Sequence, residues 1–152
     1  MNPDKRLAEL GLSLPEVVAP LAAYVPAVRT GNLVYTSGQL PMSGGELVAT
    51  GKVGAEVTPE RAAELARLCA LNALAAVRSL VGDLSQVVRI VKVVGFVASA
   101  PDFTGQPQVV NGASELLGEV FGEAGQHARS AVGVAVLPKD APVEVELIAE
   151  VR

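Results

Sequence analysis

The hydrophobic pattern is clearest at the end of the chain, where apolar and polar residues alternate after Pro142. Successive side chains of a β-strand point to opposite faces, so this alternation predicts a strand over residues 143–151 with one buried face. The residues expected to point inward are Val143, Val145, Leu147, Ala149 and Val151. Those expected on the opposite face are Glu144, Glu146, Ile148 and Glu150.

A second apolar segment, residues 129–137, precedes this strand and is separated from it by the turn sequence Pro138-Lys139-Asp140. The two segments are therefore expected to form a hairpin. Its register would place Glu150 opposite Arg129. Glu144 would then lie about 20 Å along the strand from Arg129, at about 3.3 Å per residue.

Two other parts of the chain also have the pattern of β-structure. Residues 25–28 and 33–37 flank Gly31-Asn32, which supplies the positive-φ residues of a two-residue turn, so we expect a β-hairpin there. Residues 87–98 are a β-branched run, which is typical of a buried strand.

Two helices are predicted between these strands. Thr58-Pro59-Glu60 combines an N-cap, a proline at the first helical position and an acid in the first turn, so a helix begins there. Its apolar stripe continues to about Leu80. A second helix is expected from about Pro107 to near Gly122.

The elements follow the order β-β-α-β-α-β-β, so residues 1–152 are predicted to form one α+β domain with a mixed sheet. Residues 1–20 are an N-terminal extension, expected to be a short helix or arm and then an extended segment around Pro15 and Pro20. Two helices can cover only one face of the sheet. The other face carries glutamates but is otherwise apolar, so we expect it to pack against another subunit.

The composition narrows the possible functions. A net charge of −4 and the small number of aromatic residues, two tyrosines and three phenylalanines, argue against a nucleic-acid partner. No apolar run approaches the ~20 residues that span a bilayer, and residues 1–10 lack a signal-peptide core, so we expect a cytoplasmic protein without membrane contact. One cysteine allows no internal disulfide. The sequence has no histidine–cysteine cluster, phosphate loop or dinucleotide fingerprint.

Arg129 stands at the start of an apolar strand. An unpaired buried guanidinium is costly, so this arginine is either paired or binds an anion. Its planar fork suits a carboxylate held by two parallel hydrogen bonds, which makes Arg129 a candidate clamp for a small carboxylic acid. The alternative is a structural salt bridge, for which the hairpin register supplies Glu150.

Several short motifs occur in order between residues 24 and 151. They are Gly31-Asn32-Leu33-Val34-Tyr35-Thr36-Ser37-Gly38-Gln39-Leu40-Pro41, Thr58-Pro59-Glu60, Ile90-Val91-Lys92-Val93, Asp102-Phe103, Val110-Asn111, Ala128-Arg129-Ser130 and the stretch 137–149. Each motif is weak alone. Together they resemble the YjgF/RidA family of reactive intermediate deaminases, as a divergent subgroup.

The resemblance implies the chorismate-mutase-like fold and a barrel-like homotrimer with clefts between subunits. Active members of the family hydrolyse imines and enamines of the 2-aminoacrylate type to 2-oxo acids and ammonia without a cofactor or a metal. A small 2-imino or 2-oxo acid is therefore the expected ligand. The family arginine that clamps the substrate carboxylate falls on Arg129, and the glutamate that positions water falls on Glu144. Residues that line the cleft fall on Tyr24, Ser37, Gly38, Asn111 and Ala131.

Two of the candidate positions have two interpretations each, and two others have one. Asn111, near a helix start, either caps the helix or faces the cleft. His127 either tunes the cleft by titrating near neutral pH or is an exposed loop residue. Ser37 is interpreted as a strand end whose hydroxyl and backbone bind a ligand. Cys69, on an apolar helix stripe, is expected to be a small buried residue.

Ala131 stands where a cleft cysteine is common in the family. Because that position contributes largely through its backbone, hydrolysis remains compatible with alanine. Two other functions stay open. A non-catalytic carboxylate-binding or regulatory trimer would be stabilised by 2-oxo acids without releasing ammonia. A ribonuclease, an older label of some relatives, is disfavoured by the negative charge and the lack of a histidine pair.

Overall fold

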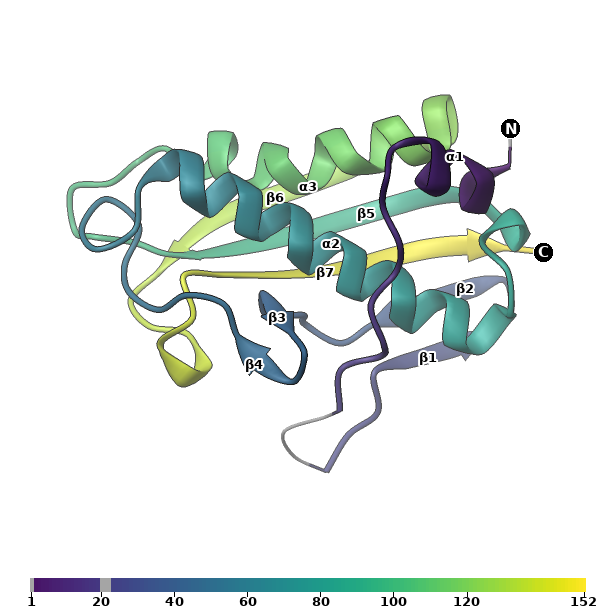
Figure 1. Cartoon of the computed structure of the whole chain (residues 1–152), viewed down its shortest axis with the longest axis horizontal. Coiled ribbons are helices and arrows are strands. Elements are labelled where there is room, and N and C mark those ends of the chain that lie inside the picture. Colours follow the sequence, from purple (N-terminus) through teal and green to yellow (C-terminus); the bar gives the residue numbers. More distant parts are fainter. Residues whose placement is uncertain (1, 20–22) are drawn as a thin grey trace.

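The computed structural model describes residues 2–19 and 23–152, and its centre is a five-stranded sheet in the order β1-β2-β7-β5-β6 (Figure 1). The strands are β1 (Ala27–Thr30), β2 (Leu33–Thr36), β5 (Val87–Ala98), β6 (Ala128–Val134) and β7 (Val143–Val151). A small ribbon consists of β3 (Met42–Ser43) and β4 (Glu46–Leu47). Short 3₁₀ turns are η1 (Leu84–Gln86), η2 (Gly122–Gly125) and η3 (Pro138–Asp140).

Helices α2 (Pro59–Val81) and α3 (Gln106–Phe121) lie side by side on one face of the large sheet, and α1 (Pro3–Glu9) contacts α3 (Figure 1). β5 and β6 are parallel, whereas the other neighbouring strands are antiparallel. The sheet is therefore mixed, and the predicted α+β fold with two long helices on one face is confirmed.

The expected hairpin between the last two strands is wrong. β5 lies between β6 and β7, because α3 forms the crossover that a parallel β5–β6 pair requires. Residues 135–142, which include η3, then carry the chain past β5 to its other side. In the observed register Arg129 is opposite Val93, and Glu150 is opposite Leu33 and Arg89. The Arg129–Glu150 salt bridge, the alternative to a carboxylate clamp, therefore does not form.

The two long helices pack closely because small residues face each other. The Thr58 hydroxyl accepts a hydrogen bond from the backbone of Arg61, which caps α2 as predicted. Where α3 crosses α2, a Cβ on Gly112 would lie 1.9 Å from the carbonyl oxygen of Ala63. No other residue fits at that contact, so Gly112 fixes the distance between the helices.

The alternation along β7 is confirmed. The odd-numbered residues from Val143 to Val151 are buried beneath the helices, and the four residues between them are half-buried on the opposite face. In the register of the sheet, that opposite face also contains apolar side chains of other strands. They are Val28, Tyr35, Val94, Phe96 and Val132.

The N-terminal extension begins with the expected short helix. The Asn2 side chain caps α1, Leu7 enters the core, and the Arg6 Nε donates to the carbonyl oxygen of Glu119 at the end of α3 over 2.9 Å. From there the chain crosses in front of α2 toward β1 (Figure 1). Pro15 lies in a segment without regular structure, and Pro20 lies outside the described residues.

Candidate functional site

Arg129 is held against the first turns of α3. Its partner across the sheet, Val93, is fully buried under the helices, so the Arg129 side chain leaves β6 on the helix-covered face. One guanidinium nitrogen, Nη1, donates to Asn111 Oδ1 over 2.7 Å and to Ser114 Oγ over 3.2 Å. The other, Nη2, donates to the Pro107 carbonyl oxygen over 3.3 Å.

The packing of α3 on β5 places these acceptors. A Cβ on Gly95 would lie only 2.4 Å from Val110 Cγ2, so Val110 packs directly on the strand backbone. Asn111 follows Val110 and lies one helical turn before Ser114, so both side chains reach the same arginine. Asn111 therefore does not cap the helix, whose N-cap residue is Gly105.

The partners of Arg129 leave its charge uncompensated. An amide oxygen, a hydroxyl and a carbonyl carry no net charge, and no carboxylate within the described ranges forms an ion pair with Arg129. A half-buried guanidinium that is oriented but not neutralised is suited to bind an anion. On the same face of β6, Ala131 packs against the core beneath α3.

Glu144 lies at the start of β7 on the opposite face of the sheet, against the segment that follows β2. A Cβ on Gly38 would lie 1.9 Å from Glu144 Oε1, so only glycine lets the carboxylate occupy this position. Backbone hydrogen bonds of 2.8 and 3.0 Å between Gln39 and Val145 hold the Gly38 segment against β7. The Gly38 backbone and the Glu144 carboxylate are therefore in fixed contact.

The environment of Glu144 favours its protonated form. Burial is the main cause of a raised pKa, and the nearby Glu146 carboxylate adds to it. A half-buried carboxylate with a raised pKa is a stronger proton acceptor than an exposed glutamate.

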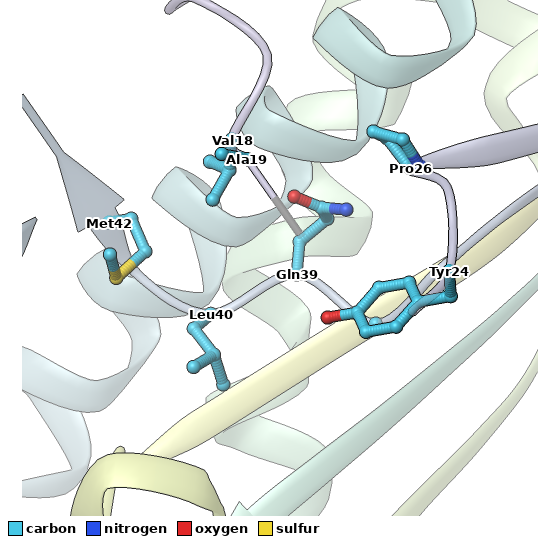
Figure 2. Close-up of a pocket in the computed structure, with 8 residues that line it drawn as sticks. Val18, Ala19, Tyr24, Pro26, Gln39, Leu40 and Met42 are labelled. Carbon is cyan, nitrogen blue, oxygen red and sulfur yellow. The ribbon is translucent and has the colours of Figure 1, made fainter. Parts of the chain in front are cut away.

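Tyr24 lies beside the same segment, on the wall of a small pocket (Figure 2). The other residues of the wall are Val18, Ala19, Pro26, Gly38, Gln39, Leu40 and Met42. The volume open to the centre of a water molecule is about 30 Å³. Ser37 is tied to the segment before β1, because its hydroxyl donates to the Val25 carbonyl oxygen over 2.6 Å.

The candidate residues thus form two groups on opposite faces of the sheet. Arg129, Asn111 and Ala131 lie on the helix-covered face at the β6 edge, whereas Glu144 and Gly38 lie on the open face. The register makes this unambiguous, because Arg129 aligns with buried positions of β5 and β7 and Glu144 aligns with half-exposed Phe96. One chain does not bring the arginine and the glutamate together.

Of the residues linked to Arg129 by hydrogen bonds, Ser114 was not anticipated from the sequence, whereas His127 was. Ser114 was missed, although its spacing of three residues from Asn111 on a predicted helix was an available signal. His127 lies in a loop, as one interpretation had it, but it is half-buried and not exposed. It is hydrogen-bonded to Ser114. Cys69 is buried as predicted, and burial raises the pKa of its thiol well above the usual value.

The residues that the structure describes include no helix long and apolar enough to cross a membrane. Within the same residues, no group of three or more histidine, cysteine, aspartate or glutamate side chains is arranged to hold a metal ion.

Comparison with known proteins identifies the family. The family model described as "YjgF/chorismate mutase-like, putative endoribonuclease" matches residues 4–151. The chain is 37% identical over 133 residues to the 2-iminobutanoate/2-iminopropanoate deaminase of Escherichia coli strain K12, covering 86% of this chain and 89% of that protein. The chain therefore belongs to the YjgF/RidA family, and the predicted family and fold are confirmed.

Two other proteins are more similar to this chain, but their names state no activity. Protein TCP17 of Trypanosoma cruzi is 45% identical over 147 residues, covering 96% of this chain and 92% of TCP17. The crystal structure of Atu1372 from Agrobacterium tumefaciens, a protein of unknown function, superposes with a TM-score of 0.91 and 50% identity. It covers 99% of this chain and 93% of that chain.

Proposed function

We propose that this chain catalyses the hydrolytic deamination of small 2-imino acids and their enamine tautomers to 2-oxo acids and ammonia, without a cofactor. The observation that carries the proposal is the Arg129 guanidinium, which is oriented by three uncharged acceptors and has no carboxylate partner among the described residues. A substrate carboxylate supplies the missing charge. The similarity to a relative named as a 2-iminobutanoate/2-iminopropanoate deaminase supports the choice of reaction.

The chemistry needs little beyond positioning. An imine carbon is already electrophilic, so a water molecule adds to it when a base accepts the water proton. The new carbon–oxygen bond pushes the C=N π pair onto nitrogen, which takes a proton. The amino group of the carbinolamine then takes up a second proton and leaves as ammonia, while the hydroxyl gives its proton to the base and the C=O bond forms. Glu144, with its raised pKa, is the proposed group that accepts and returns the proton.

The separation of Arg129 and Glu144 leads to a proposal for the assembly. A single chain offers the two residues on opposite faces, so a complete cleft requires an Arg129 group from one subunit and a Glu144 group from its neighbour. The open face provides an apolar surface for such contact, with Val28 52% and Val132 43% exposed in the isolated chain. We propose a homotrimer in which these faces point inward.

An assay with imines tests the reaction directly. A panel of amino acids is oxidised in the assay mixture to release 2-imino acids, and the rate of 2-oxo acid and ammonia formation is compared with and without the protein. The wild-type chain should accelerate the reaction, and Arg129→Ala should not. If no imine in the panel is hydrolysed faster than in the protein-free control, the proposed reaction is wrong.

The non-catalytic alternative makes a different prediction for the same samples. A carboxylate-binding trimer would gain thermal stability from 2-oxobutyrate but release no ammonia. A ribonuclease would cleave RNA in a way that is lost on substituting Arg129 or Glu144. We expect no such cleavage, because the net charge of −4 gives no basic surface for a phosphate backbone.

A further inference from the structure

A chain of hydrogen bonds continues behind Arg129 to His127, the one histidine in the sequence. Ser114 Oγ, which accepts from Arg129 Nη1, lies 2.9 Å from His127 Nε2. On the other side of the imidazole, His127 Nδ1 lies 2.6 Å from the Gly125 carbonyl oxygen. The guanidinium, hydroxyl, imidazole and carbonyl are thus joined in a single line.

The carbonyl of Gly125 fixes the direction of one bond, and a neutral ring then fixes the direction of the other. A carbonyl oxygen only accepts, so Nδ1 of His127 must carry a proton and donate to Gly125. In the neutral ring Nε2 is then an acceptor, and it takes the hydroxyl proton of Ser114. Because the Ser114 hydrogen is directed to His127, the lone pairs of its oxygen remain available to the arginine, which is a donor only.

Tight backbone packing near His127 keeps the hydrogen-bonded groups in place. A Cβ on Gly125 would lie 2.2 Å from the Leu117 carbonyl oxygen, so the η2 turn lies directly on α3. Gly125 is buried, and the α3 helix supplies both this support and Ser114. The distance from the Gly125 carbonyl to the Ser114 hydroxyl is therefore set by one rigid unit.

We infer that His127 and Ser114 are positioning residues for the arginine clamp. The neutral Nδ1–H form of His127 directs the Ser114 hydroxyl, which in turn holds one edge of the Arg129 guanidinium, so that the remaining N–H groups keep a fixed direction toward a carboxylate. This inference rests on the proposed function, because it assigns to Arg129 the binding of a carboxylate ligand.

The first test observes the tautomer without any ligand. Since the chain has a single histidine, the imidazole nitrogen signals in a ¹H–¹⁵N NMR spectrum need no further assignment. In the neutral ring we expect a protonated Nδ1 and an unprotonated, hydrogen-bonded Nε2. If the spectrum shows the Nε2–H tautomer, His127 donates to Ser114 instead of accepting from it. This result would overturn the inference, whatever the catalytic activity.

The second test uses two amide substitutions that differ in reach. In His127→Gln the side-chain oxygen can occupy the place of Nε2 and accept from Ser114. In His127→Asn the amide reaches only the place of Nδ1 and cannot. We expect His127→Asn and Ser114→Ala each to weaken binding of 2-oxobutyrate about two- to tenfold, the effect of one neutral hydrogen bond. His127→Gln should bind nearly as the wild type does.

A double variant, the kinetic constants and a control variant test whether the loss of binding comes from these hydrogen bonds. The double substitution Ser114→Ala with His127→Asn should weaken binding no more than either change alone, because both break the same line. The deaminase reaction should show the change in KM more than in kcat. Ser79→Ala, a serine-to-alanine change near the end of α2, is the matched control and should leave binding unchanged.

The outcomes separate this inference from the proposed function. If the wild type binds 2-oxobutyrate but makes no ammonia, the proposed reaction is wrong, and the ranking of the variants by affinity still decides the role of His127. If the wild type hydrolyses imines but His127→Asn, His127→Gln and Ser114→Ala all bind equally well, the proposed function stands and the positioning role is overturned.

Discussion

At the scale of single residues, the main feature of this molecule is a positive charge and a negative charge that do not meet within one chain. Arg129 is surrounded by neutral acceptors on the helix-covered face. Glu144 lies in contact with the Gly38 segment on the other face, where burial and Glu146 raise its pKa. The uncompensated charge of Arg129 and the half-buried carboxylate of Glu144 each cost free energy in the single chain. Such costly arrangements are common where side chains bind a ligand.

The prediction for Arg129 separates charge from geometry. Arg129→Ala removes the clamp, and Arg129→Lys keeps the charge but loses the planar fork. A charge-assisted hydrogen bond is worth about 1.5–3 kcal/mol, so loss of the pair should lower kcat/KM for 2-imino acids at least about tenfold in both variants. Light scattering should show that both still assemble. Unchanged 2-oxobutyrate binding by folded Arg129→Ala would show that Arg129 does not hold the carboxylate.

The prediction for Glu144 concerns stability and pH. Its pKa in the folded chain is raised above the ordinary value of 4.5, so the protonated form favours folding and this contribution is lost as the pH rises through the folded-state pKa. Glu144→Gln, which stays neutral, should therefore raise the melting temperature at pH 7 and have little effect below the ordinary glutamate pKa. The same variant should lose most imine hydrolysis. Equal melting temperatures of wild type and variant at pH 7 would contradict the raised pKa.

At the scale of elements, local sequence signals predicted the helices and strands well. Thr58-Pro59 marked the start of α2, and the alternation after Pro142 gave both faces of β7. The pairing of strands was harder, because the apolar segments on either side of Pro138 have the pattern of a hairpin. The observed arrangement depends on the α3 crossover, which places β6 beside β5. The residues of the Pro138–Asp140 turn give no indication of that pairing.

In the candidate site, too, contacts that depend on tertiary packing could not be predicted from the sequence. The motif residues Arg129 and Asn111 were predicted to line one cleft, and they are hydrogen-bonded to each other. Ser114 and His127 were not assigned a common role, because their contact depends on how α3 and the η2 turn pack and not on any sequence motif. The assignment of residues to opposite faces of the sheet likewise required the strand order.

A prediction for the α3–β5 contact tests how the site is supported. Gly95→Ala would place a methyl group 2.4 Å from Val110 Cγ2, so α3 must move away from the sheet. We expect a loss of about 1–3 kcal/mol in the free energy of unfolding, measured by urea at matched protein concentration. Adding Val110→Ala should recover part of this loss. Gly118→Ala, in open space on the same helix, is the control and should not destabilise.

At the scale of the whole molecule, the open face of the sheet carries apolar side chains that the single chain leaves exposed. Half-buried Glu144 and Glu146 lie there among exposed apolar side chains such as Val28, Tyr35 and Val132. If three copies bury this face, the assembly has a mass of about 47 kDa, three times the 15.6 kDa of one chain. Light scattering at micromolar concentration checks this, and a stable monomer would contradict both the trimer and the cleft between subunits.

The last prediction asks whether one cleft takes Arg129 from one subunit and Glu144 from the next. Folded Arg129→Ala and Glu144→Gln proteins, each inactive alone, are unfolded together, mixed in equal amounts and refolded so that subunits assort at random. A cleft is intact when its arginine comes from a Glu144→Gln chain and its glutamate from an Arg129→Ala chain. Random assortment should therefore restore about one quarter of the wild-type activity.

A control with each variant refolded alone sets the baseline for this experiment. Refolded wild type gives the reference activity for the same procedure. If both residues of a cleft came from the same chain, every cleft in the mixture would lack one of them and the mixture would stay inactive. Restored activity can arise only when Arg129 of one chain and Glu144 of another chain line the same cleft. Within one chain the two residues lie on opposite sides of the sheet.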